Sequence, residues 1–145
     1  MTFNTKGLMS SLKQDWTTPK ALYDELNKEF NFDFDPCPVN PQFDGLNIEW
    51  RLRNFVNPPY KTSKFWIAKA YTQNSYGKLV VMLIPARTDT KAFHKYIYKN
   101  PKVEIRFLKG RLKFGDAKTG APFPSMIVIF KGIKESDYQL DVTWS

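Results

Sequence analysis

Residues 79–84 read LVVMLI and residues 126–130 read MIVIF, and both runs are continuously apolar. Runs of this length without alternating polar positions are typical of strands that are covered on both faces of a sheet. The sequence therefore predicts a central sheet with helices on both sides. Further strand-like segments are predicted at residues 32–35, 54–56, 103–108 and 111–114.

Three helices are predicted between these strands. The first begins at Thr18 and Pro19, because Pro suits the first helical position and Thr can cap it. The second covers residues 63–76, and the third covers about residues 88–100 with Thr88 or Asp89 as its cap. Alternating strands and helices predict an α/β fold with a mostly parallel sheet. The last strand is expected to run antiparallel, because its connection from Phe114 lacks a helix.

Length and composition favour one soluble domain. The 145 residues suit a single domain, with residues 1–14 as a loosely held arm and residues 15–145 as the domain itself. No apolar run reaches the ~18–20 residues of a membrane span, and the polar opening lacks a secretory apolar core. We therefore expect a cytoplasmic protein that does not contact membranes. Cys37 is the only cysteine, so the chain cannot form an internal disulfide. Cys37 and His94, the only histidine, are too few to form a zinc site, so no metal is expected.

The charge balance indicates a polyanionic partner. There are 22 Lys and Arg against 14 Asp and Glu, giving a net charge of +8. Such a surface gains affinity for nucleic acid by releasing counterions from phosphates. Aromatic residues make up 16% of the chain, and aromatic faces among cations are what unstacked bases bind. The alternative is that the charge keeps the protein soluble and the rings fill the core, and composition alone does not decide.

Loops that follow strand ends are where ligands bind in such sheets, and three are expected here, at residues 35–38, 57–60 and 85–89. Residues 57–60 read Asn-Pro-Pro-Tyr, in which two prolines remove backbone donors and leave carbonyl groups as outward acceptors. Asn57 Oδ1 and the Pro58 carbonyl can together accept both hydrogens of a planar amino group, while Tyr60 offers a stacking ring. Acceptors preorganised in this way make the nitrogen nucleophilic. The alternative is a structural turn with a buried tyrosine.

This motif resembles the catalytic loop of S-adenosylmethionine-dependent amino-methyltransferases that act on adenine. The chain as a whole is similar to the small phage-type (Dam-like) DNA N6-adenine methyltransferases over about residues 15–130. The resemblance implies a minimal Rossmann-like class I methyltransferase sheet and a site-specific adenine-directed activity. The matching segments, in order, are residues 15–19 (DWTTP), 34–37 (FDPC), 44–46 (DGL), Trp50, 57–60 (NPPY), 87–90 (RTDT), 109–114 (KGRLKF) and 122–125 (PFPS).

The resemblance implies roles for individual positions. The catalytic residues would be Asn57, Pro58, Pro59 and Tyr60, which grip an adenine that is flipped out of the DNA. The cofactor-binding residues would be Trp16, Thr17, Thr18, Pro19, Asp35, Pro36 and Cys37. Phe123 would stack on the other face of the base, or it is a core residue. Four cations are expected to contact DNA because of their position or charge. Arg87 follows a strand end, where ligands bind. Lys109, Arg111 and Lys113 would contact phosphates, and the alternative is that they form the solvated face of a strand.

The chain departs from larger methyltransferases in two ways. It has Pro36, Cys37 and Pro38 where they carry a glycine-rich turn, and no G-x-G-x-x-G cradle is present. The usual second and third strands are also missing, since residues 39–50 are mostly loop. Asp44 or Glu49 would have to replace the usual ribose-binding acid, or either is a solvated loop residue.

Other functions compete with this interpretation. A cytosine C5-methyltransferase would use a Pro-Cys nucleophile, which Pro36 and Cys37 offer, but the supporting acid and flanking sequence are lacking. Related loops also methylate RNA or protein glutamine. A catalytically inactive methyltransferase-like module that binds DNA is a further alternative, and the oligomeric state is not predicted.

Overall fold

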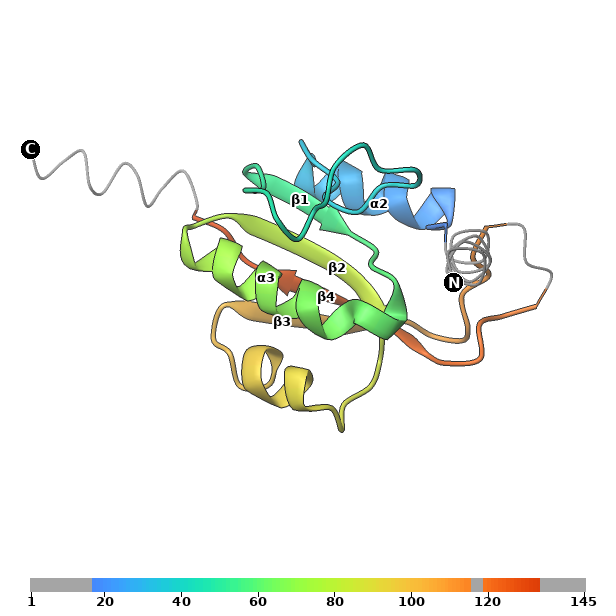
Figure 1. Ribbon diagram of the computed structural model, residues 1–145. Coiled ribbons are helices and arrows are strands. Elements are labelled where there is room, and N and C mark those ends of the chain that lie inside the picture. Colours follow the sequence, from blue (N-terminus) through green and yellow to red (C-terminus); the bar gives the residue numbers. More distant parts are fainter. Residues whose placement is uncertain (1–16, 116–118, 134–145) are drawn as a thin grey trace, which may run out of the picture.

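A four-stranded sheet forms the centre of the structure, a computed structural model that describes residues 17–115 and 119–133 (Figure 1). The expected arm of residues 1–14 and Trp16 lie outside these described residues. The sheet has the order β1-β2-β4-β3. Its strands are β1 (Arg53–Val56), β2 (Leu79–Pro85), β3 (Val103–Phe107) and β4 (Ser125–Phe130).

The direction of the strands agrees with the sequence prediction, but their pairing is more mixed. β1 pairs with β2 in parallel, and β4 pairs antiparallel with both β2 and β3. β1, β2 and β3 therefore run one way, and the last strand runs against them as predicted. Because β4 lies between β2 and β3, only one of the three ladders is parallel, which corrects the expectation of a mostly parallel sheet.

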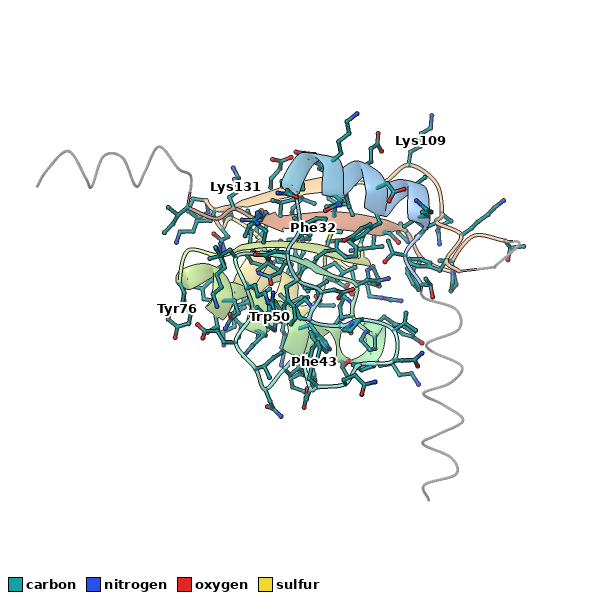
Figure 2. All side chains as sticks on the ribbon, turned by 90° about the horizontal axis from the view of Figure 1, so that it is seen from above. Phe32, Phe43, Trp50, Tyr76, Lys109 and Lys131 are labelled. Carbon is teal, nitrogen blue, oxygen red and sulfur yellow. The ribbon has the colours of Figure 1, made fainter. Side chains whose placement is uncertain are left out.

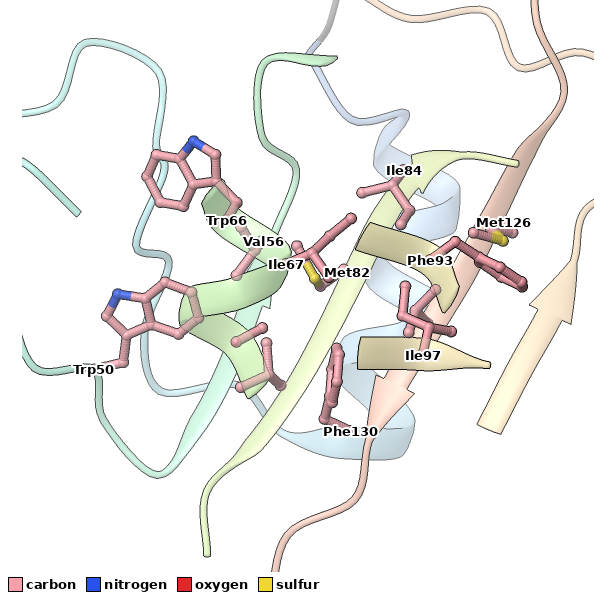
Figure 3. Packing of buried hydrophobic residues seen from close by; sticks show 13 residues of the cluster. Trp50, Val56, Trp66, Ile67, Met82, Ile84, Phe93, Ile97, Met126 and Phe130 are labelled. Carbon is pink, nitrogen blue, oxygen red and sulfur yellow. The ribbon is translucent and has the colours of Figure 1, made fainter. Parts of the chain in front are cut away.

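Helices cover both faces of the sheet. α2 (Lys20–Phe30) contributes to one face, and α3 (Ser63–Ser75) lies over β2 and β4 on the other with the short π-helical segment η2 (Phe93–Ile97) (Figure 1). Side chains alternate between the faces because successive strand residues point in opposite directions. The cluster under α2 contains Leu26, Phe55, Val81, Leu83, Phe114, Phe123, Ile127 and Ile129. The cluster under α3 and η2 includes Val56, Trp66, Ile67, Met82, Ile84, Phe93, Ile97, Met126 and Phe130 (Figure 3).

The bounds of α2 and α3 follow the sequence closely, whereas the helix predicted over about residues 88–100 is reduced to a short helical segment at residues 91–97 that includes η2. Two of the expected caps are also wrong. Pro19 occupies the N-cap position of α2 and no side chain caps this helix, so Thr18 is not its cap. Near η2, the hydroxyl of Thr90 accepts a hydrogen bond from Phe93 N at 3.2 Å, and this corrects the expected cap at Thr88 or Asp89. Gly77 follows α3 with φ 89°, a left-handed conformation that glycine adopts without strain.

Two predicted strands are absent. Residues 32–35 contribute only a single parallel bridge, between Phe34 and Asn54, because Pro36 follows without an N–H and ends the pairing. Residues 111–114 are not a strand either; a backbone bond from Ala121 N to Leu112 O at 2.8 Å links them to the described part of the returning chain. Residues 39–50 form turns and no strand, as expected. Within the described part of the chain, no helix has the length and apolar character needed to cross a membrane.

Candidate active site

A cavity of about 500 Å³ opens where β1 ends. Its volume lies within the ~300–1,000 Å³ that small-molecule sites usually occupy. Its walls come from the residues before α2, from residues 35–45 and from residues 57–59. Most of the lining is apolar and conformationally stiff, with Pro36, Pro38, Pro41, Phe43, Phe55, Pro58, Pro59 and Trp66. Its polar residues are Thr17, Thr18, Lys20, Tyr23, Asp35, Asp44 and Asn57.

Asp35 places a carboxylate on this apolar wall. The residue follows the Phe34–Asn54 bridge directly, so the sheet fixes its position at the cavity. Burial raises the pKa of Asp35 from 3.8 to about 6, although Cys37 N donates to Oδ1 at 2.9 Å and thereby favours the charged form. A carboxylate held in such surroundings is a partner for a cation inside the cavity.

Asn57 is oriented by a contact with the chain that precedes α2. Its Nδ2 donates to Thr18 Oγ1 at 2.9 Å, across 39 positions of sequence. Thr18 and Asn57 both line the cavity, so this bond closes one side of it. The Thr18 hydroxyl, which was expected to cap α2, therefore accepts a hydrogen bond from the Asn57 carboxamide instead. Because only the nitrogen of a carboxamide donates, this bond fixes which side of the group carries Nδ2 and which carries Oδ1.

The Asn-Pro-Pro-Tyr loop is held rigidly between β1 and α3. Pro58 is buried, and Tyr60 begins the short 3₁₀ segment η1 (Tyr60–Thr62), which continues into α3. The Pro59 carbonyl accepts from Thr62 N at 3.1 Å. The expectation that both proline carbonyls face outward therefore needs correction, since the Pro59 carbonyl is used inside the turn.

Tyr60 and Phe123 bring two aromatic rings together beside this loop. Their centroids are 6.0 Å apart at an interplanar angle of 44°, which is direct ring contact. The guanidinium of Arg87 lies 5.7 Å from the Phe123 centroid. A cavity of about 10 Å³, lined by Asn57, Pro58 and both rings, lies here and has room for about one water molecule. Phe123 is also buried in the core. It therefore has the environment expected of a core residue and also lies beside Tyr60, where it was expected to stack on a base.

The expected cofactor residues converge on the large cavity. Thr17, Thr18, Asp35, Pro36 and Cys37 line it, while Pro19 does not. Trp16 was the remaining residue of this set and lies outside the described residues. Asp44 lines the cavity too, with its carboxylate accepting from Leu46 N and Asn47 Nδ2. Glu49 is not part of the lining and contacts Lys78 instead.

The basic residues expected to contact DNA lie outside this cavity. Lys109, Arg111 and Lys113 are exposed in the loop that follows β3. Figure 2 shows Lys109 on the α2 side of the sheet, with Phe43 and Trp50 on the α3 side. Gly115 N donates to Thr17 O at 2.9 Å, so this loop is tied to a residue that lines the cavity.

A buried polar cluster that the sequence did not indicate fixes the end of residues 39–50, the loop whose first half forms a wall of the cavity. Lys78 is only 7% exposed, and its Nζ donates to Trp50 O at 2.6 Å and Gln73 Oε1 at 2.7 Å. Gln73 Oε1 also accepts from Trp50 N at 3.0 Å. The position of Lys78 directly before an apolar strand is only weak evidence that its side chain is buried, because most lysines are exposed. Its buried ammonium anchors the end of this loop to α3.

Gly45 lets this wall approach the loop at Asp35. A Cβ built on Gly45 lies 1.9 Å from the Pro36 carbonyl oxygen, so any side chain here displaces backbone. Trp50 Nε1 donates to Gly45 O at 2.7 Å and holds the contact closed. Pro36 and Gly45 both line the cavity, so their contact is part of its wall.

The site combines an apolar cavity beyond a strand end, a half-buried carboxylate and a rigid loop shared with a pair of aromatic rings. Cavities beyond strand ends are where α/β proteins usually bind small molecules, and the paired rings are suited to a planar group. The model of the DNA N-6-adenine-methyltransferase (Dam) family matches residues 5–143, and the chain belongs to that family. Searches of the curated proteins and of the solved structures gave no match. Among the residues that the structure describes, no group of three His, Cys, Asp or Glu is placed to hold a metal ion.

Proposed function

We propose that this protein transfers a methyl group from S-adenosylmethionine to the N6 amino group of adenine in DNA, on a minimal Rossmann-like class I methyltransferase sheet. One observation carries the proposal. Asn57 and Pro58 line both the large cavity and the small one beside Tyr60 and Phe123. A methyl donor in the first and a base at the second would therefore meet at these two residues. Membership of the Dam family supports the choice of DNA adenine as the substrate.

The large cavity fits the cofactor in size and in chemistry. Its volume of about 500 Å³ suits a nucleoside with an attached amino acid. Asp35 offers a carboxylate for the ammonium group, and Thr17 and Thr18 offer hydroxyl groups nearby. Phe43 and the prolines provide apolar surface for the remainder. When bound, S-adenosylmethionine supplies an electrophilic methyl group on a sulfonium.

The Asn-Pro-Pro-Tyr loop activates the amino group in this proposal. Thr18 holds Asn57 Nδ2, which orients the carboxamide so that Oδ1 acts as the acceptor. Asn57 Oδ1 and the Pro58 carbonyl accept the two N6 hydrogens and thereby localise the nitrogen lone pair for attack on the methyl carbon. As the bond from N6 to the methyl carbon forms, the bond from that carbon to the sulfonium sulfur would break, and the methylated N6 then loses its surplus proton to water.

The target base has to open the contact between Tyr60 and Phe123. With centroids 6.0 Å apart the rings contact each other, so a base between them separates them first. Extrusion of the base from the duplex costs a few kcal/mol, and stacking on Tyr60 returns about 1–3 kcal/mol. Base flipping and ring opening thus belong to one binding step.

Methyl transfer to DNA tests the proposal directly. The protein is incubated with labelled S-adenosylmethionine and unmethylated genomic DNA, and the nucleosides are then separated. We expect label in N6-methyl-2′-deoxyadenosine, and loss of that label in Asn57→Ala with cofactor affinity largely kept. Label in cytosine, in RNA or in a glutamine peptide alone would refute the adenine assignment, and DNA binding without cofactor binding would refute catalysis.

A further inference from the structure

A third cavity, of about 250 Å³, lies beside Tyr60 between the start of α3, the end of β2 and η2. We propose that it binds one nucleotide adjacent to the target adenine, with the base in the recess and the phosphate on the surrounding cations. This inference rests on the proposed function and specifies how the DNA strand is held. The volume falls below that of most whole-ligand sites and suits the base of a single nucleotide.

The cavity has an apolar floor and a cationic rim. The floor is made of buried residues of the sheet and its cover, namely Ile67, Ile84, Phe93, Ile97 and Met126. The rim carries four exposed cations, Lys61, Lys64, Arg87 and Lys91. Among the described residues that line it, none is an aspartate or glutamate. A recess with low-dielectric walls and charges of one sign concentrates the field on an anion, while the floor receives a planar apolar group.

The start of α3 adds to the same field. Ser63 and Lys64 belong to its first turn, and that turn contains no acidic residue. The positive end of the dipole of a 13-residue helix therefore faces this rim together with the lysines. A phosphate is the anion that this combination favours, because backbone dipole and side-chain cations act on it from neighbouring positions.

The position of the cavity assigns it to a neighbouring nucleotide and not to the target. Neither Asn57 nor Pro58 lines it, so a base here cannot present its amino group to that acceptor pair. Tyr60 lines both this cavity and the small one at Phe123. The two sites therefore share one ring, as required for successive nucleotides of an extruded strand.

The charge component is tested by salt titration of DNA binding. Lys64→Gln and Lys91→Gln are each expected to reduce the slope of log affinity against log salt by about 0.7–0.9, the value for one lost phosphate contact. Lys28→Gln is the matched control, because Lys28 is exposed in the last turn of α2, which covers the face of the sheet opposite to α3. Equal slopes for all three variants would overturn the proposal.

The base component is tested by filling the recess. Ala92 lines the cavity, and Ala92→Phe occupies it while leaving the four cations in place. Affinity is measured for a single-stranded oligonucleotide with one adenine and for the same strand made abasic only at the nucleotides next to that adenine. Wild type is expected to prefer the strand with bases by at least about fivefold, in line with the ~1–3 kcal/mol that stacking of one base contributes. Ala92→Phe is expected to lose that preference while binding the abasic strand as before, and an unchanged preference in a folded variant would refute the inference.

Methyl transfer by the same variant separates the neighbouring nucleotide from the target. We expect Ala92→Phe to raise the KM for DNA with kcat within about twofold of wild type, because lost ground-state binding alone leaves the chemical step intact. A loss of kcat of about tenfold at unchanged KM would place the target adenine in this cavity and overturn the assignment. If wild type transfers no methyl group at all, the proposed function fails, but the comparison of the two strands still decides whether the cavity binds a nucleotide.

Discussion

Replacing Asp35 with asparagine is expected to stabilise the protein at neutral pH and to weaken its hold on the cofactor. Burial raises the pKa of Asp35 from 3.8 to about 6, so the folded state binds a proton that the unfolded chain has already lost. At 1.36 kcal/mol per pKa unit, the charged carboxylate destabilises the fold by roughly 3 kcal/mol at about pH 7.5. The carboxamide of the Asp35→Asn variant has no such charge, and its Oδ1 can still accept from Cys37 N.

The pH dependence has a definite sign. Because the folded pKa of Asp35 is raised, wild type gains stability as the pH falls from about 7 through 6 toward 4. Asp35→Asn lacks this gain, so the two stability curves should converge near about pH 4. Denaturant unfolding at several pH values measures the difference, and calorimetry with S-adenosylmethionine at about pH 7.5 measures the affinity, which should fall at least about tenfold because a charged hydrogen bond is lost. The reasoning would be refuted if Asp35→Asn were less stable than wild type at neutral pH. It would also be refuted if the difference in unfolding free energy between the two proteins did not change with pH.

Three further changes test other parts of the site. Thr18→Val removes the acceptor for Asn57 Nδ2 and should lower kcat by about 2–13-fold, the equivalent of ~0.5–1.5 kcal/mol; Thr18→Ser should restore it, and equal kcat values in both variants would contradict a positioning role. Gly45→Ala forces a Cβ against the Pro36 carbonyl and should cost ~1–3 kcal/mol in unfolding free energy, so an unchanged thermal midpoint would count against this contact. Cys37→Ser should keep methyl transfer within about twofold, because the proposed chemistry needs no thiolate; complete loss together with a covalent DNA adduct in wild type would reverse that view.

The parts of the fold that apolar patterning controls were predictable from sequence. β2, β4, α2 and α3 lie where the runs and stripes placed them, because burial of continuous apolar surface leaves few alternatives. Residues 111–114 looked strand-like for the same reason. Leu112 and Phe114 do pack on the core under α2, but the backbone between them lacks a neighbouring strand to pair with among the described residues. Apolar character alone does not supply hydrogen-bonding partners.

The site was predictable where it depends on local chemistry, and less so where distant segments meet. The stiffness of Pro58 and Pro59 and the exposure of Asp35 to a cavity follow from short stretches of sequence. The bond from Asn57 to Thr18 and the burial of Lys78 depend on tertiary contacts across 39 and 28 positions, which no local pattern encodes. Thr18 in particular had a sufficient local explanation as a helix cap, and that explanation proved wrong.

The wall that Asn57 and Pro58 share between the two cavities has a thermodynamic consequence. If occupancy on one side stiffens this wall, binding on the other side loses less conformational freedom, and the benefit is mutual. In the proposed function, linkage requires that DNA binding raise the affinity for the cofactor by the same factor by which the cofactor raises the affinity for DNA. The methylated DNA and the demethylated cofactor would likewise raise the affinity for one another by one common factor. Release of either product would therefore weaken binding of the other.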